Sequence, residues 1–77
     1  MIPRPEGADC LIVWRGYSPR DPNYEVCFIS YGDANDNPIG RRDWFSHADV
    51  ALGLARTLAA DGGLTRILDK TGDAPVA

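Results

Sequence analysis

A single segment of this 77-residue chain has the apolar spacing of an amphipathic helix, and this limits the architectures open to it. At 100° per residue, the segment 46–61 gathers apolar side chains on one side: Val50, Ala51, Leu54, Ala55 and Leu58. Ser46 is a suitable N-cap, and Asp49 takes the position of the glutamate in a capping box. Gly62 and Gly63 then end the helix. One helix covers only one face of a sheet, so other segments must supply the rest of the core.

Three runs before the helix have the composition of β-strands, because they are rich in β-branched and aromatic residues. They cover residues 10–15 (CLIVWR), 24–31 (YEVCFISY) and 39–45 (IGRRDWF). Segments rich in Gly, Pro, Asp and Asn separate them, at 16–23 and 32–38. The short first connection predicts that the first two strands form an antiparallel hairpin.

Residues 64–70 (LTRILDK) fit either a fourth strand or a short helical turn, and we expect the strand. The expected fold is therefore α+β: a small antiparallel sheet of three to four strands, in the order β-β-β-α-β, with one helix packed on one face. We expect this domain to span residues 8–70, between flexible tails at 1–7 and 71–77 that have little to bury. Since the strands are apolar on both sides, the face without the helix should expose hydrophobic surface, which often marks a partner or a dimer.

The composition is that of a globular domain, with 44% hydrophobic and 25% charged residues. The net charge of −3 disfavours nonspecific binding to phosphates and favours docking on a basic surface. No apolar run approaches the ~18 residues that a bilayer span needs. Residues 1–7 lack the apolar core of a secretory signal, so we expect a cytoplasmic protein.

Two features suggest a metal or redox site, and neither pattern is complete. Cys10 and Cys27 lack the paired spacing of a zinc ligand set, and we expect free, packed thiols, with a cross-strand disulfide open as an alternative. The run 33–37 (DANDN) starts like a calcium loop, but Pro38 and Trp44 occupy the positions of its glycine and bidentate carboxylate. We therefore expect a conformational turn and no metal ion.

Catalytic chemistry has little support in the sequence. Ser46, His47 and Asp49 are residue types of a catalytic triad, but adjacency in sequence is not triad geometry. His47 is the only histidine, which leaves little general-base chemistry near neutral pH. The chain has no glycine-rich phosphate loop. We expect no enzyme, no catalytic residue and no cofactor.

Nucleic-acid binding is an alternative that depends on one cluster. Arg41 and Arg42 adjoin Trp44 and Phe45, and Arg15 follows Trp14. Basic residues among aromatics are typical of surfaces that stack single-stranded bases. The acidic balance of the chain argues against this alternative, for which the contact residues would be Arg41, Arg42 and Trp44.

The segments SPRDPNYEV (18–26) and GRRDWFS (40–46), followed by an alanine-rich helix, resemble the layout of small anti-CRISPR proteins of phages and mobile elements. The resemblance is architectural, covers residues 18–70 loosely and assigns no residue a role. It implies a non-enzymatic, stoichiometric inhibitor that docks on a CRISPR surveillance complex or nuclease. For such a partner we expect contacts from solvent-facing acids and aromatics: Asp33, Asp36, Tyr17, Tyr31 and Trp44. A homodimer, paired through open sheet faces or an edge strand, is the structural alternative.

Overall fold

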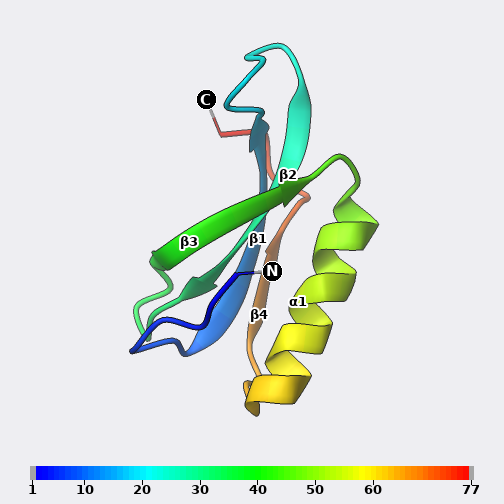
Figure 1. The fold of residues 1–77 in the computed structure, drawn as a ribbon. Coiled ribbons are helices and arrows are strands. Elements are labelled where there is room, and N and C mark those ends of the chain that lie inside the picture. Colours follow the sequence, from blue (N-terminus) through cyan, green and yellow to red (C-terminus); the bar gives the residue numbers. More distant parts are fainter. Residues whose placement is uncertain (1, 77) are drawn as a thin grey trace.

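The computed structural model describes residues 2–76 as a four-stranded sheet with one α-helix (Figure 1). The elements follow one another as β1 (Cys10–Tyr17), β2 (Glu25–Gly32), β3 (Pro38–Phe45), α1 (Ala48–Gly62) and β4 (Ile67–Lys70). The α+β class and the order β-β-β-α-β predicted from the sequence are confirmed. The ambiguous segment 64–70 contains a strand, shorter than expected.

The order of strands across the sheet is β3-β2-β1-β4. The β1–β2 and β2–β3 pairs are antiparallel, whereas β4 pairs parallel with β1. The sheet is therefore mixed and not purely antiparallel as expected. The reason is α1, because a helix between two strands carries the chain back along the sheet, and the next strand then runs in the direction of the previous one.

The helix begins differently from the prediction. His47 is the N-cap residue and makes no side-chain capping bond, so the capping box expected from Ser46 is wrong. The Ser46 hydroxyl instead accepts a hydrogen bond of 2.7 Å from the Tyr24 hydroxyl. The helix ends at Gly63 as expected, where φ is 69°, a left-handed conformation that favours glycine.

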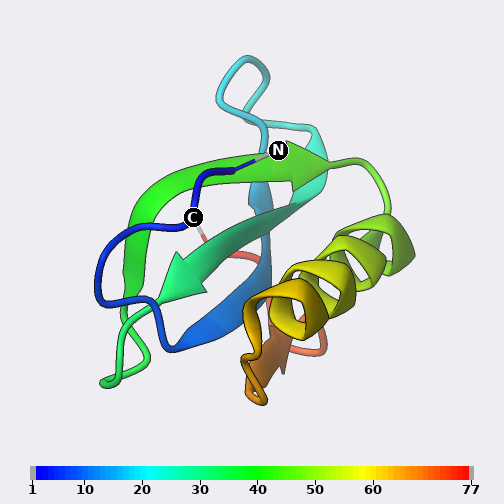
Figure 2. The ribbon, with the colours of Figure 1, turned by 60° about the horizontal axis from the view of Figure 1, so that its bottom comes forward.

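The main core lies between α1 and one face of the sheet (Figure 2). Alternation along β1 and β2 directs every second side chain toward the helix. The buried side chains that meet there are Leu11, Val13, Cys27, Ile29 and Tyr31 from the sheet and Ala51, Ala55, Leu58 and Ala59 from the helix. The small alanine side chains let the helix lie close to the strands, so α1 closes this face completely enough to leave Leu11, Val13 and Ile29 with no exposed surface.

Both terminal segments contact the domain. Ile2 is 6% exposed within the helix-side core, so the expectation that residues 1–7 have little to bury does not hold for it. Arg4 donates a hydrogen bond of 2.8 Å to a carbonyl in the last turn of α1. The Arg15 guanidinium donates two hydrogen bonds, of 3.2 and 2.7 Å, to the Asp73 carbonyl and so holds the C-terminal segment against β1.

Candidate binding face

The open face of the sheet is the side opposite α1. Strand alternation and register assign two cross-strand rows to it. The first row crosses all four strands as Lys70, Trp14, Phe28 and Trp44. The second crosses them as Leu68, Ile12, Ser30 and Arg42. The first row is therefore aromatic except for Lys70 at its β4 end. The second row, beside it, ends in a cation at the other edge of the sheet, Arg42 on β3.

Ring contacts join Trp14, Phe28 and Arg42 at the centre of the open face. The Trp14 and Phe28 rings stack, with centroids 5.5 Å apart and planes 23° apart. The Arg42 guanidinium lies 4.4 Å from the Phe28 ring centroid on the same face. Phe28 is only 3% exposed, so it supports Trp14 and Arg42 and offers little surface of its own. Arg42 itself is exposed, and the side of its guanidinium away from Phe28 is available to a ligand.

Charge is divided between the two faces of the sheet. The strands contain three carboxylates, Glu25, Asp43 and Asp69, which register places opposite Tyr17, Ile29 and Val13 respectively. All three therefore belong to the helix-side face. The helix-side face also carries Arg15, which pairs with Glu25 at 3.0 Å. The open face differs, since its strand positions carry Arg42 and Lys70 and no carboxylate. A chain with net charge −3 thus has a locally cationic face.

Two hollows lie next to each other on the open face. The first, of about 150 Å³, is lined by Trp14, Gly16, Tyr17, Phe28, Arg42 and Val76. The second, of about 270 Å³, is lined by Ile12, Trp14, Pro38, Lys70 and Val76. Trp14 and Val76 line both, and each hollow has one cation at its wall. The first depends on Gly16, because a Cβ there would lie 2.8 Å from a Phe28 ring carbon.

The apolar surface of the open face is smaller than the sequence predicts. Ile12 and Val26 are each 1% exposed, which shows that neighbouring side chains already cover them. What the face presents to solvent is the half-buried side chains of Trp14, Trp44 and Leu68, the exposed Val76 in the wall of both hollows, and the exposed Arg42 and Lys70. This mixture of apolar side chains and cations differs from the purely hydrophobic patch that would suit burial in an obligate dimer.

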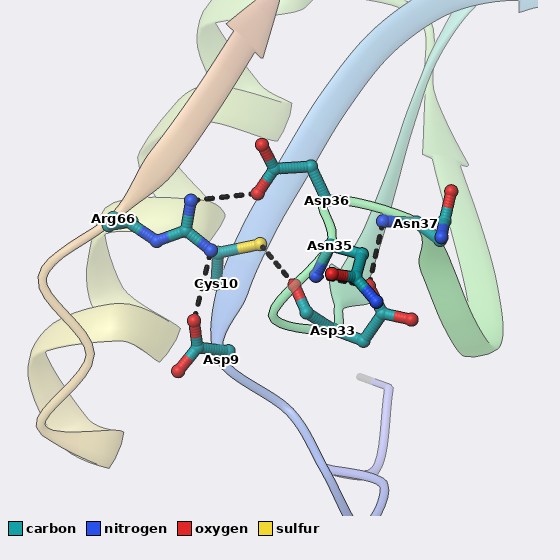
Figure 3. A network of polar contacts seen from close by, with 7 residues as sticks. All are labelled: Asp9, Cys10, Asp33, Asn35, Asp36, Asn37 and Arg66. Carbon is teal, nitrogen blue, oxygen red and sulfur yellow. Dashed lines mark hydrogen bonds and ion pairs between the residues drawn. The ribbon is translucent and has the colours of Figure 1, made fainter.

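The acidic residues expected to bind a partner are engaged within the domain (Figure 3). Asp33 closes the β2–β3 turn, since its Oδ1 accepts the amides of Asn35 and Asn37 at 2.9 Å each. Asp36 forms a 2.7 Å ion pair with Arg66, which also binds Asp9 at 3.0 Å. The hydrogen bonds that Arg66 donates to these two carboxylates raise its pKa. The turn is therefore joined to the residues that directly precede β1 and β4.

The other residues singled out from the sequence are separated by the fold. Tyr17 is 39% exposed and borders the first hollow, and Trp44 lies on the open face. Tyr31 is 4% exposed in the helix-side core, so the expectation that it faces solvent is wrong. Arg41 lies in a bulge of β3, because pairing shifts between Ser30 and Tyr31. Arg42 and Trp44 share the open face, as the nucleic-acid alternative requires.

Two further residues complete this face: Trp14, which the sequence pattern pairs with Arg15 but which is absent from the expected contact residues, and Lys70, which sequence reasoning missed. Trp14 was visible as an aromatic residue in a strand, but its neighbours depend on the register of three strand pairs. Lys70 comes next to Trp14 only because β4 runs parallel to β1. The helical periodicity and strand composition carry no information about that pairing.

The cysteines and the triad-type residues form no reactive site. Cys10 and Cys27 are free, and register places them on opposite faces of the sheet, which rules out a disulfide between them. Desolvation by burial raises the pKa of both thiols. His47 is exposed, and Ser46 is paired with Tyr24 and not with the imidazole. Within residues 2–76, no group of three or more His, Cys, Asp or Glu side chains could hold a metal ion.

Comparison with protein-family models, curated proteins and solved structures gave no match. In the described part of the chain, α1 is too short and too polar to cross a bilayer. A function for this chain must therefore be inferred from the chemistry of the open face. Rings and cations without carboxylates can stack on planar groups and attract anions.

Proposed function

We propose that this protein is a non-enzymatic binding domain and that the open face of its sheet binds single-stranded nucleic acid. The observation that carries the proposal is the row of Lys70, Trp14, Phe28 and Trp44 across all four strands, with Arg42 stacked on Phe28. Unpaired bases stack on aromatic rings and on guanidinium planes, while Lys and Arg attract the phosphates. Two buried free thiols suit the reducing cytoplasm, where we place the protein.

The division of charge answers the main objection to this ligand. The net charge of −3 argues against phosphate binding when it is treated as uniform. The strand carboxylates, however, belong to the face under α1, and Asp9 and Asp36 are paired with Arg66. Screening at physiological salt limits charge interactions to within about 8 Å, so the cations nearest the ligand matter more than the net charge.

The test is fluorescence anisotropy with a labelled 12-nucleotide oligothymidylate at low salt. The decisive pair of variants is Arg42→Gln and Arg56→Gln, because each removes one exposed arginine and only Arg42 is on the open face. We expect Arg42→Gln to weaken binding about tenfold, as for the loss of one stacked, charge-assisted contact, and Arg56→Gln to change it little. Equal effects would mean that only net charge acts, and absence of binding by the unmodified protein would overturn the proposal.

A second candidate follows from the resemblance to anti-CRISPR proteins: a stoichiometric inhibitor that binds a CRISPR surveillance complex or nuclease. It is favoured by the exposed rings of Tyr17 and Tyr24, 39% and 45% exposed, on a chain of negative net charge. Affinity purification of the tagged protein from host lysate, with and without nuclease, tests it. Recovery of such a complex after nuclease treatment would support this candidate, and its loss on treatment would favour nucleic acid as the ligand. If the complex is retained, loss of binding in Tyr17→Ala would assign the contact.

A further inference from the structure

We infer that the open face binds two consecutive nucleotides, one at each hollow, with the Trp14 ring between them; this rests on the proposed function. The two hollows are neighbours because Trp14 and Val76 line both. Each has apolar walls and one cation, Arg42 in the first and Lys70 in the second. A ligand that matches this surface must repeat a planar apolar group and an anion, which is the repeat of a single strand.

The first hollow presents its groups in a fixed arrangement. Phe28 holds the Arg42 guanidinium 4.4 Å from its ring centroid and stacks against Trp14 at 5.5 Å. Gly16 leaves the space open, and the Val76 amide donates to the Arg15 carbonyl at 2.9 Å, which fixes the far wall. A base that enters here meets the exposed side of the guanidinium and the edge of Trp14, without any need for the site to rearrange.

The second hollow is larger and depends on β4. Register sets Lys70 directly beside Trp14 on β4, whereas Phe28 lies beside Trp14 on β2, the opposite neighbour of β1. Pro38 and Ile12 supply apolar walls, and Lys70 is exposed at the rim. A second base that contacts Trp14 from this side leaves its phosphate near the Lys70 ammonium. The two phosphates of a 5′-phosphorylated dinucleotide would therefore meet separate cations on either side of Trp14.

The experiment measures affinity against length and salt. In a Trp44→Phe background, where Trp14 is the only tryptophan, we titrate 5′-phosphorylated thymidine mono-, di- and tetranucleotides and follow Trp14 fluorescence. We expect a step of about tenfold or more in affinity from one to two nucleotides, the gain of one stacked base, and only a small further gain at four. For a 12-nucleotide strand, Arg42→Gln and Lys70→Gln should each reduce the slope of log K against log salt by about 0.7.

The controls separate failure of this inference from failure of the proposed function. Measured by the anisotropy of labelled mono- and dinucleotides, which needs no tryptophan reporter, Trp14→Phe keeps a ring and should retain most of the dinucleotide step. Trp14→Ala should lose it, with circular dichroism to verify folding. If Lys70→Gln leaves the salt slope unchanged while Arg42→Gln reduces it, the face binds nucleic acid at one hollow only, and the two-site inference is wrong. If affinity rises evenly with length, the footprint is not two nucleotides. If no oligonucleotide binds, both proposals fall.

Discussion

Cys10 and Cys27 are buried thiols whose pKa values burial raises above the ordinary value. Each therefore holds its proton more tightly in the folded than in the unfolded chain. The contribution of these protonated thiols to the free energy of unfolding is complete below the unfolded pKa of 9.0. It is lost as the pH rises from 9.0 through the higher pKa of the folded chain. We expect the free energy of unfolding by urea to be level between pH 7 and 8 and to fall above pH 9.

The double variant Cys10→Ala, Cys27→Ala provides the control for this pH dependence. It should be less stable at pH 7, because it loses buried sulfur contacts, but its stability should decline less steeply between pH 8 and 10. Parallel curves for the two proteins would show that other groups cause the alkaline loss. Reaction with a disulfide reagent is a separate measurement on the same two residues. A protonated, buried thiol should react with it only when the chain unfolds.

Single residues also mark how far the sequence alone could lead. Asp33 was predicted to serve the conformation of its turn, and its two bonds to backbone amides agree with this. Tyr31 was expected at the surface because its strand is apolar on both sides, and composition cannot tell which side α1 will cover. The Ser46 cap prediction was wrong because the helix begins at Ala48, which makes His47 the N-cap residue, while the Ser46 hydroxyl bonds Tyr24, distant in sequence. A sequence pattern thus predicts a side chain's role when its bonding partners are close in sequence, as for Asp33, and not when they are distant, as for Tyr31 and Ser46.

At the scale of elements, the strands and the helix were predictable, whereas their pairing was only partly so. Turn residues and strand composition located β1, β2 and β3 to within two residues at each end. The parallel alignment of β4 follows from a helix standing before it, but its position beside β1 depends on which edge of the sheet remains unpaired. Since that choice brings Lys70 to Trp14, the place of Lys70 on the candidate binding face could not have been found from the sequence.

Edges and faces decide whether the whole molecule associates with itself. β4 is a four-residue edge, and the β3 edge begins at Pro38 and is interrupted by a bulge at Gly40 and Arg41. Short, bulged and charged edges resist pairing with another chain. The open face carries Arg42 and Lys70 without carboxylates, so two copies face to face would bring like charges together.

We therefore expect a monomer of 8.4 kDa in size-exclusion chromatography with light scattering, across the micromolar range and at both low and high salt. The informative comparison is Trp14→Glu, which places a carboxylate at the centre of the open face. If the unmodified protein has twice the monomer mass and Trp14→Glu restores the monomer, the open face is a homodimer interface and is not free for nucleic acid. If both proteins are monomeric and only Trp14→Glu loses oligonucleotide binding, the same face is available to a ligand, as the division of charge across the sheet requires.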